Sequence, residues 1–213
     1  MKLKNTASVL FWNVDTQNDF MKASGKLYVQ DAEEIELTLE RLTRFAKKYN
    51  IKVLNTCDFH NEKTIELSST PDFIATFPPH CMENTEGQDF VMATKPDIAV
   101  IFDWDKEYSS EEIREMVNSQ RNIVIRKDFF DVFYNNPNAE NVVNALAPKK
   151  IFVYGVTTNV CVNFAVKGLA KRGYNVFVIE DAIKELPNIP MPFENWKTYG
   201  VALIKAQEIV NYI

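Results

Sequence analysis

The chain has 213 residues, of which 46% are hydrophobic and 25% charged, so it is long enough to bury one sizeable core. Its net charge of -5 excludes a broadly basic surface, so we expect no nucleic-acid partner. No apolar run reaches the roughly 18 residues of a membrane span, and Asn13 and Asp15 interrupt the first apolar run too early for a signal peptide. We therefore predict a cytoplasmic protein with no membrane partner. The three cysteines are expected to be reduced thiols.

Strand-like apolar runs alternate with amphipathic helical segments along the chain, without a low-complexity linker or an internal repeat. Strands are expected over 8–14, 51–56, 98–102, 122–126, 150–154, 174–179 and 201–204. Helices are expected over 35–49, 110–118, 139–146 and 161–172, with a last helical turn after Ala206. This alternation predicts an α/β fold, a three-layer αβα architecture with a mostly parallel central sheet, in a single domain over 1–213.

Three residues are expected to mark the ends of these elements. Glu34 follows Asp31 at the spacing of a capping box, which predicts that Asp31 caps the first long helix. Gly155 is expected to form the tight turn out of the strand before it. Gly173 lies where a C′ glycine ends a helix.

Cys161 opens a predicted helix directly after a strand and a turn, in the segment Gly155-Val156-Thr157-Thr158-Asn159-Val160-Cys161-Val162. The first turn of a helix carries partial positive charge and unpaired N–H groups, and both favour a thiolate. Free cysteines are more often small buried core residues. The hypothesis of a nucleophile therefore depends on the residues near the thiol.

Asp15 and Lys127 follow two other predicted strands, and parallel α/β sheets place their sites beyond the carboxyl ends of the strands. A lysine ammonium near the sulfur lowers the thiol pKa. A carboxylate can take the thiol proton and later give it to a leaving amine. Taken alone, Asp15 and Lys127 are more typical of a structural ion pair. Because both accompany Cys161, we interpret the three residues as a catalytic set.

Asp58, His60 and His80, with Glu66 between the histidines, form a second group of interest. The two histidines are the only ones in the chain. Asp-x-His places two ligands on one extended segment, and the later histidine can complete a divalent-metal site. The alternative is that the histidines are ordinary polar residues near the surface. Cys57 is expected to point away from Asp58, because successive strand residues alternate between faces.

Six stretches of this sequence resemble, in order along the chain, the isochorismatase-like cysteine hydrolases, and within that superfamily the nicotinamidases. They are Val14-Asp15-Thr16-Gln17-Asn18-Asp19-Phe20, Asp58-Phe59-His60, Phe77-Pro78-Pro79-His80-Cys81, Lys127-Asp128-Phe129-Phe130, Gly155 to Val162, and Glu180-Asp181-Ala182. The resemblance implies an isochorismatase-like hydrolase fold and hydrolysis of a small-molecule amide, with nicotinamide as the first candidate.

The resemblance also implies roles for individual residues. Asp15 is implied as general acid and base, Lys127 as the lysine of the triad and Cys161 as the nucleophile. A cis peptide is expected at Val156-Thr157, and the backbone N–H groups of Thr157 and Cys161 are expected to hold the oxyanion.

A pyridine pocket and a metal centre are implied in the same way. The aromatic walls are expected from Phe20, Phe77 and Tyr134, for which plain core packing is an equal alternative. The ligands of a divalent metal ion are expected from Asp58, His60, Glu66 and His80. Zinc is the first choice, iron and manganese are alternatives, and the metal is expected to bind the pyridine nitrogen.

Two positions depart from the nicotinamidase pattern. Glu66 stands where many nicotinamidases have a third histidine, and Glu62 is a nearby alternative ligand. Asn159 stands two residues before the nucleophile, where nicotinamidases usually have an aspartate. A metal-independent amidase for a ureido or carbamoyl compound, isochorismatase itself and a non-catalytic relative therefore stay open as alternatives. A homo-oligomer is equally open.

Overall fold

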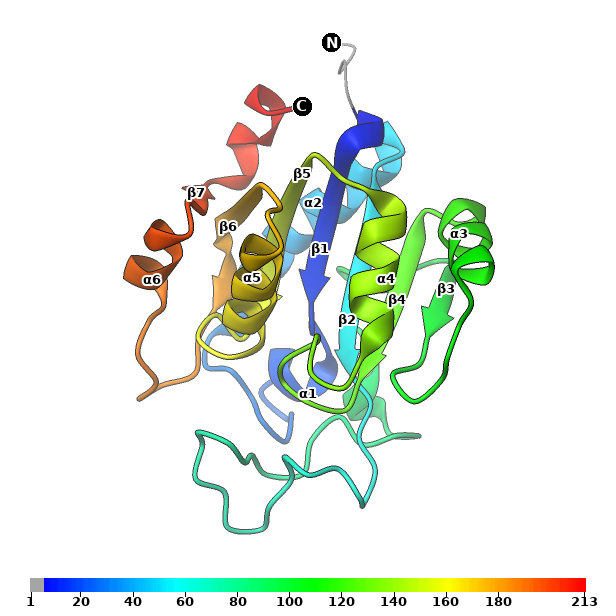
Figure 1. The fold of residues 1–213 in the computed structure, drawn as a ribbon. Coiled ribbons are helices and arrows are strands. Elements are labelled where there is room, and N and C mark those ends of the chain that lie inside the picture. The colour runs from blue at the N-terminus through cyan, green and yellow to red at the C-terminus, as the bar shows by residue number, and fades with distance from the viewer. Residues whose placement is uncertain (1–5) are drawn as a thin grey trace.

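Seven parallel strands form one sheet at the centre of the computed structural model, which describes residues 6–213 (Figure 1). They are β1 (Val9–Val14), β2 (Lys52–Asp58), β3 (Ala99–Phe102), β4 (Asn122–Lys127), β5 (Lys150–Val156), β6 (Val176–Lys184) and β7 (Ala202–Ile204). Their order across the sheet is β3-β4-β2-β1-β5-β6-β7, and each neighbouring pair is parallel. The predicted strands are therefore confirmed, and the sheet is parallel throughout its described part.

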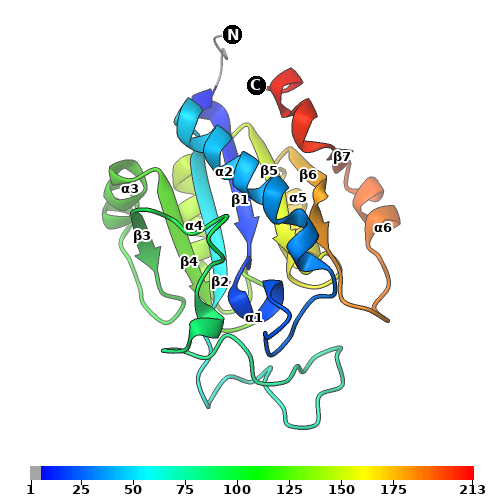
Figure 2. The ribbon, with the colours of Figure 1, turned by 180° about the vertical axis from the view of Figure 1, so that it is seen from behind.

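Helices cover both faces of this sheet. The helices α3 (Ser110–Ser119), α4 (Pro137–Leu146) and α5 (Cys161–Lys171) lie on the face turned to the viewer in Figure 1. The helix α2 (Glu36–Tyr49) crosses the opposite face, as Figure 2 shows. This arrangement confirms the three-layer αβα fold. Within residues 6–213, no helix has the length and apolar character needed to cross a membrane.

Short elements complete the chain. They are the α-helices α1 (Asn18–Met21) and α6 (Phe193–Thr198) and the 3-10 turns η1 (Thr6–Ser8), η2 (Ala32–Ile35), η3 (Glu86–Gln88) and η4 (Ala206–Asn211). A long connection between β2 and β3 lies beyond the carboxyl ends of the strands, at the bottom of Figure 1. The extent of a single domain over 1–213 stays a prediction, and its first five residues lie outside the described range.

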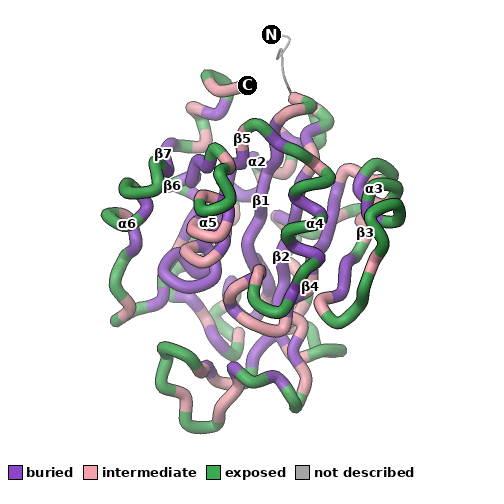
Figure 3. Tube along the Cα trace, viewed as in Figure 1, coloured by how far each residue is buried: buried purple, intermediate pink, exposed green. Residues whose placement is uncertain are grey.

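The hydrophobic core lies along the central strands. All six residues of β1 are buried, and so is β5 after its first residue. In Figure 3 these strands are buried, while the outward sides of α3 and α4 are exposed. Burial on both faces explains why the strands are continuous apolar runs rather than alternating ones. Each large apolar side chain buried there contributes about 1.5–3 kcal/mol to the stability of the fold. The core thus holds the strand ends in place.

The predicted turn at Gly155 was wrong, because this residue lies inside β5. Its φ is +117°, and a Cβ there would lie 2.0 Å from the carbonyl oxygen of Val14 in the neighbouring strand. Glycine is therefore required by the close approach of β1 and β5. The strand continues to Val156 before the chain turns toward Cys161.

The predicted capping box at Asp31 was also wrong. Asp31 has a left-handed backbone (φ 59°), its side chain makes no capping hydrogen bond, and the turn η2 separates it from α2. An N-cap residue needs an extended backbone instead. The side chain of Glu34 pairs with Lys184 at 2.8 Å.

The C-terminal end of α5 is as expected. Gly173 follows the C-cap residue of this helix with a φ of +83°.

Candidate active site

The sheet brings the predicted catalytic residues to one edge. Asp15 directly follows β1, and Lys127 is the last residue of β4, where it is the register partner of Asp58 at the end of β2. Cys161 is the first residue of α5, a short turn beyond β5. Because β4, β2, β1 and β5 are consecutive neighbours, their carboxyl ends gather these side chains.

Lys127 lies at the centre of the set. Its Nζ is 3.0 Å from Asp15 Oδ2 and 3.9 Å from Cys161 Sγ, and it also donates to the carboxylate of Asp58. Asp15 Oδ1 accepts a hydrogen bond from the Thr56 hydroxyl at 2.6 Å. All of these side chains are buried. One buried cation thus serves two carboxylates and the thiol.

Burial controls the protonation of these groups. It raises the pKa of the Cys161 thiol well above its usual value, and the ammonium of Lys127 opposes this only in part. Burial likewise raises the pKa of Asp15. Burial disfavours the charged amine of Lys127, but the carboxylates of Asp15 and Asp58 outweigh it and raise the lysine pKa well above its usual value. The position of Cys161 at the helix start is therefore not sufficient to ionise the thiol. A nearby base can take the thiol proton, and Asp15 and Asp58 each have a carboxylate oxygen within 4.8 Å of the sulfur.

The turn before Cys161 has the features expected of an oxyanion hole. The peptide Val156-Thr157 is cis, as predicted. Within residues 6–213, the backbone N–H groups of Thr157 and Cys161 have no hydrogen-bond acceptor, whereas those of Val160 and Val162 both donate to the Thr157 carbonyl. Two unpaired N–H donors beside a thiol are what a developing oxyanion requires.

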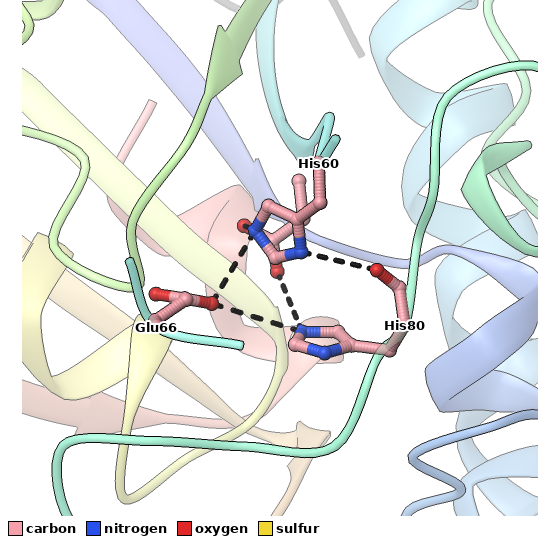
Figure 4. Close-up of side chains that lie close together, drawn as sticks. His60, Glu66 and His80 are labelled. Carbon is pink, nitrogen blue, oxygen red and sulfur yellow. Dashed lines mark hydrogen bonds and ion pairs between the residues drawn. The ribbon is translucent and has the colours of Figure 1, made fainter. Parts of the chain in front are cut away.

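The four predicted metal ligands converge at the same edge. One donor atom from each of Asp58, His60, Glu66 and His80 lies within 4.8 Å of the others, and all four residues are buried. His60 Nε2 is 3.3 Å from Glu66 Oε1, and His80 Nε2 is 3.5 Å from Asp58 Oδ2. Figure 4 shows the two imidazole rings and the carboxylate of Glu66 pointing toward one another.

Backbone carbonyls fix the orientation of both imidazole rings. His60 Nδ1 donates to the carbonyl of His80 at 3.0 Å, and His80 Nδ1 donates to the carbonyl of Pro78 at 2.7 Å. In each neutral ring the lone pair is therefore on Nε2, as in histidines that ligate metals. Burial disfavours the charged form of His80, but the carboxylate of Asp58 outweighs it and raises the pKa of this ring. Histidines satisfied near the surface, the alternative from the sequence, do not match this burial.

The donor set fits a divalent metal ion. His60 Nε2 and Asp58 Oδ2 are buried without a hydrogen-bond partner among the described residues. Burial lowers the pKa of His60 to about 4, which keeps the ring in its neutral, ligating form. Burial, followed by the nearby Asp58 carboxylate, raises the pKa of Glu66 to about 8. Two imidazole nitrogens and two carboxylates suit zinc as well as iron or manganese.

The neighbouring candidates lie outside this group. Glu62 is exposed, so Glu66 is the carboxylate that the geometry favours. Cys57 points to a different groove, together with Phe59 and Arg126, as strand alternation predicted. The backbone N–H of Cys81 donates to Asp19, and its thiol lies outside the four-residue group.

A narrow pocket lies against the Cys161 thiol and three of the four candidate metal ligands, namely Asp58, Glu66 and His80. Its walls are Phe20, Leu27, Asp58, Glu66, Phe77, His80, Phe130, Thr157, Val160, Cys161 and Leu186. Its free volume is about 10 Å³, close to what a single water molecule needs. Phe20 and Phe77 therefore line the pocket as expected, and a flat substrate can enter only if a wall moves.

Tyr134 does not line this pocket. It is 47% exposed and packs its ring on Phe129, with the ring centroids 4.6 Å apart. Phe130, which lies in the stretch that begins with Lys127, lines the pocket and was not expected there. Leu27 and Leu186 were missed altogether, because an apolar side chain in a loop carries no sequence signal for a pocket.

Gln17 also has a part that the sequence did not reveal. Its amide donates to the carbonyl of Asp58 and accepts from the N–H of the same residue, both at 2.8 Å. The side chain thus pairs with both backbone polar groups of Asp58, as a residue of a neighbouring strand does, and fixes this backbone in place. A buried glutamine two residues after a strand is a weak signal for such a contact.

The fold and site together define an α/β protein with a buried cysteine–lysine–aspartate set beside a candidate metal centre. The chain belongs to the isochorismatase family, since the Isochorismatase domain matches residues 9–189. This confirms the resemblance seen in the sequence motifs.

Known proteins give a consistent comparison. A nicotinamidase/pyrazinamidase of Mycobacterium tuberculosis is 36% identical over 77 residues, which are 36% of this chain and 40% of that protein. The match thus spans less than half of the relative's length. Pyrazinamidase of Pyrococcus horikoshii in complex with zinc has the same fold (TM-score 0.70, 22% identity, 93% of this chain and 99% of that one). N-carbamoylsarcosine amidase from Thermoplasma acidophilum does too (TM-score 0.70, 18% identity, 94% and 98%).

Proposed function

We propose that this protein is an amidohydrolase of the nicotinamidase type, which converts nicotinamide and water to nicotinate and ammonia. The observation that carries the proposal is that Cys161 and three of the four candidate metal ligands line the same small pocket, whose walls include Phe20 and Phe77. The likeness to the nicotinamidase/pyrazinamidase of M. tuberculosis supports the same reaction.

Asp58, His60, Glu66 and His80 are proposed to hold the metal ion, with zinc as the first choice. The zinc complex of the P. horikoshii pyrazinamidase supports this choice. When bound, the ion supplies a Lewis-acidic point that can fix the pyridine nitrogen of the substrate. Phe20 and Phe77 then hold the flat ring, so that the carboxamide carbon is directed to the sulfur of Cys161.

Acylation uses the catalytic set as follows. Asp15 takes the proton of the Cys161 thiol as the sulfur attacks the carboxamide carbon. The N–H groups of Thr157 and Cys161 hold the negative charge that develops on the carbonyl oxygen. Asp15 then gives the proton to the departing nitrogen, and ammonia leaves a thioester on Cys161.

Hydrolysis of the thioester completes the cycle. Asp15 takes a proton from a water molecule, which attacks the thioester carbon. The carbon–sulfur bond breaks, the thiolate recovers the proton, and nicotinate is released. Lys127, 3.0 Å from Asp15 and 3.9 Å from the sulfur, stabilises whichever of the two groups is negative at each stage.

A metal-independent amidase for a ureido or carbamoyl compound is the second candidate. The shared fold with N-carbamoylsarcosine amidase favours it. Such an enzyme needs Asp15, Lys127 and Cys161 but gives no reason for two buried histidines facing two carboxylates. We therefore rank it below nicotinamide hydrolysis.

An ammonia-release screen on purified protein separates the two candidates. The substrates are nicotinamide, pyrazinamide and N-carbamoyl amino acids, and the metal content of the same sample is determined. We expect ammonia from nicotinamide, with loss of activity after chelation and recovery with zinc. Turnover of carbamoyl compounds alone, unaffected by chelation, would favour the second candidate.

A further inference from the structure

Asn159 ties the turn before the nucleophile to the loop between β6 and α6. Its side-chain nitrogen donates to the carbonyls of Leu186 and Ile189, at 2.8 Å and 2.9 Å. Its side-chain oxygen accepts from the N–H of Leu186 at 3.1 Å. Asn159 is only 5% exposed, so water does not compete for these three bonds.

The loop held in this way forms one wall of the active-site pocket. Leu186 lines the pocket together with Thr157, Val160 and Cys161. Thr157 and Val160 belong to the turn that carries Asn159, and Cys161 directly follows that turn. The backbone adds one further link, since the N–H of Thr158 donates to the carbonyl of Lys184 at 2.7 Å. Asn159 therefore links the Leu186 wall to the turn that leads to the thiol.

The pocket has so little free volume that the position of this wall decides what can enter. We propose that Asn159 is a positioning residue for substrate selection: by fixing Leu186, it restricts the site to flat, compact primary amides and shields Cys161 from larger reagents. This inference rests on the proposed amide hydrolysis and deepens it by naming what limits the substrate class.

Nicotinamidases usually have an aspartate at this position, but the two carbonyl oxygens that face Asn159 in this chain require an amide side chain. An aspartate of the same shape could accept from the Leu186 N–H but would place a carboxylate oxygen against two carbonyl oxygens. Both hydrogen bonds through the nitrogen would be lost and replaced by repulsion. Asn159→Asp therefore tests the wall with almost no change in volume.

Asn138 offers a matched control. It is equally buried, at 1% exposed, and its side-chain nitrogen also donates to two backbone carbonyls, those of Asp103 and Lys106, at 2.8 Å each. These contacts lie in the loop after β3, and neither carbonyl belongs to a residue of the pocket. Asn138→Asp thus repeats the same loss of hydrogen bonds away from the site.

The first measurement is alkylation of the metal-loaded protein with iodoacetamide, followed by peptide mass spectrometry. Cys57 and Cys81 are buried thiols away from the Leu186 wall and act as internal references. We expect the labelling of Cys161, relative to these two, to rise at least about tenfold in Asn159→Asp and to stay at the wild-type ratio in Asn138→Asp. General unfolding would raise all three together.

The second measurement compares nicotinamide with a ring-methylated nicotinamide. In Asn159→Asp we expect a higher KM for nicotinamide with a smaller change in kcat. In Leu186→Ala, which also tests the wall if Asn159→Asp does not fold, we expect kcat/KM for the methylated amide to rise at least about tenfold relative to nicotinamide, the scale of discrimination by one methyl-sized group.

The outcomes separate this inference from the proposed function. If Asn159→Asp and Leu186→Ala both keep the wild-type labelling ratio and substrate preference, the positioning role is overturned. If the wild-type protein does not hydrolyse nicotinamide, the proposed function fails, whereas the labelling ratios still decide whether Asn159 holds the wall over Cys161.

Discussion

The ammonium of Lys127 lies 3.0 Å from the carboxylate of Asp15, and neither side chain is more than 2% exposed. Removing one partner of such a buried pair leaves an uncompensated charge, which is far more costly than breaking a pair at the surface. The pair therefore ties catalysis and stability to the same residue.

Lys127→Met should destabilise the protein and abolish activity. It leaves the carboxylates of Asp15 and Asp58 buried without their cation, so we expect a loss of about 3–5 kcal/mol in the free energy of unfolding, measured by urea denaturation. Lys197→Met is the control, because Lys197 is 64% exposed in its pair with Glu194 and should cost less than about 1 kcal/mol. Equal effects of the two substitutions would contradict the central role of Lys127.

Asp15→Asn should remove proton transfer while keeping the shape of the site. The amide can still accept the hydrogen bond from Thr56, and Lys127 keeps the carboxylate of Asp58 as its partner, so the fold is expected to survive. We expect kcat to fall by about 10²–10⁴, the usual contribution of general acid–base catalysis, in a steady-state ammonia assay. A kcat within a few-fold of wild type would show that another group takes the thiol proton.

His80→Ala should reduce metal binding. The variant loses one of two imidazole ligands. Mutating a residue that only orients a ligand typically lowers metal affinity by roughly 10–100-fold, so the loss of a ligand itself should lower it further. Elemental analysis after dialysis against a weak chelator measures this. Glu62→Gln, on an exposed side chain outside the group, should keep the wild-type metal content, and a loss there would move the ligand assignment from Glu66 to Glu62.

The metal-free protein should become less stable as the pH rises from 6.5 to 8. Glu66 has its pKa raised from 4.5 to about 8, so in this window the folded state holds a proton that the unfolded state has released, and stability falls with pH. His60, whose pKa is lowered from 6.5 to about 4, acts with the opposite sign but only below pH 6.5. Burial disfavours the charged ring of His80, but the carboxylate of Asp58 outweighs it and raises the His80 pKa above 6.5, so His80 acts with the same sign as Glu66.

The expected loss over this window is about 2 kcal/mol, measured by urea denaturation of the chelated protein at several pH values. Glu66→Gln should reduce the dependence, because the amide does not titrate, and the slope that remains should come from His80. Stability of the chelated wild type that rises with pH between 6.5 and 8 would contradict the burial of a protonated Glu66.

The sheet and the proximity of Asp15, Lys127 and Cys161 could be predicted because they depend on local signals. Continuous apolar runs indicate strands buried on both faces, and the residues after those runs must meet at one edge of a parallel sheet. Asp15, Lys127 and Cys161 follow from that rule alone. The candidate metal ligands were recognised from the spacing of two histidines and two carboxylates along the chain. These side chains are brought together by the long connection between β2 and β3, whose path no periodic pattern in the sequence predicts.

The remaining errors have physical causes in contacts between distant segments. Gly155 resembles a turn residue in sequence, but its conformation is set by the Val14 carbonyl in the neighbouring strand. The strand β6 continues past Ile179 to Lys184 because Ile183 and Lys184 pair with Gly155 and Val156 beyond a register shift. The pocket-lining residues Leu27 and Leu186 lie in loops. Nothing in the sequence around them indicates that they line a pocket.

Cys161 is proposed to attack the amide carbon and to carry the acyl group. This role is tested most directly by mixing the metal-loaded protein with nicotinamide, quenching with acid within one turnover, and mapping the modified peptide by mass spectrometry. We expect a nicotinoyl group on Cys161 in the wild type, and neither this adduct nor ammonia release in Cys161→Ala. Ammonia released at the wild-type rate by Cys161→Ala would contradict this role.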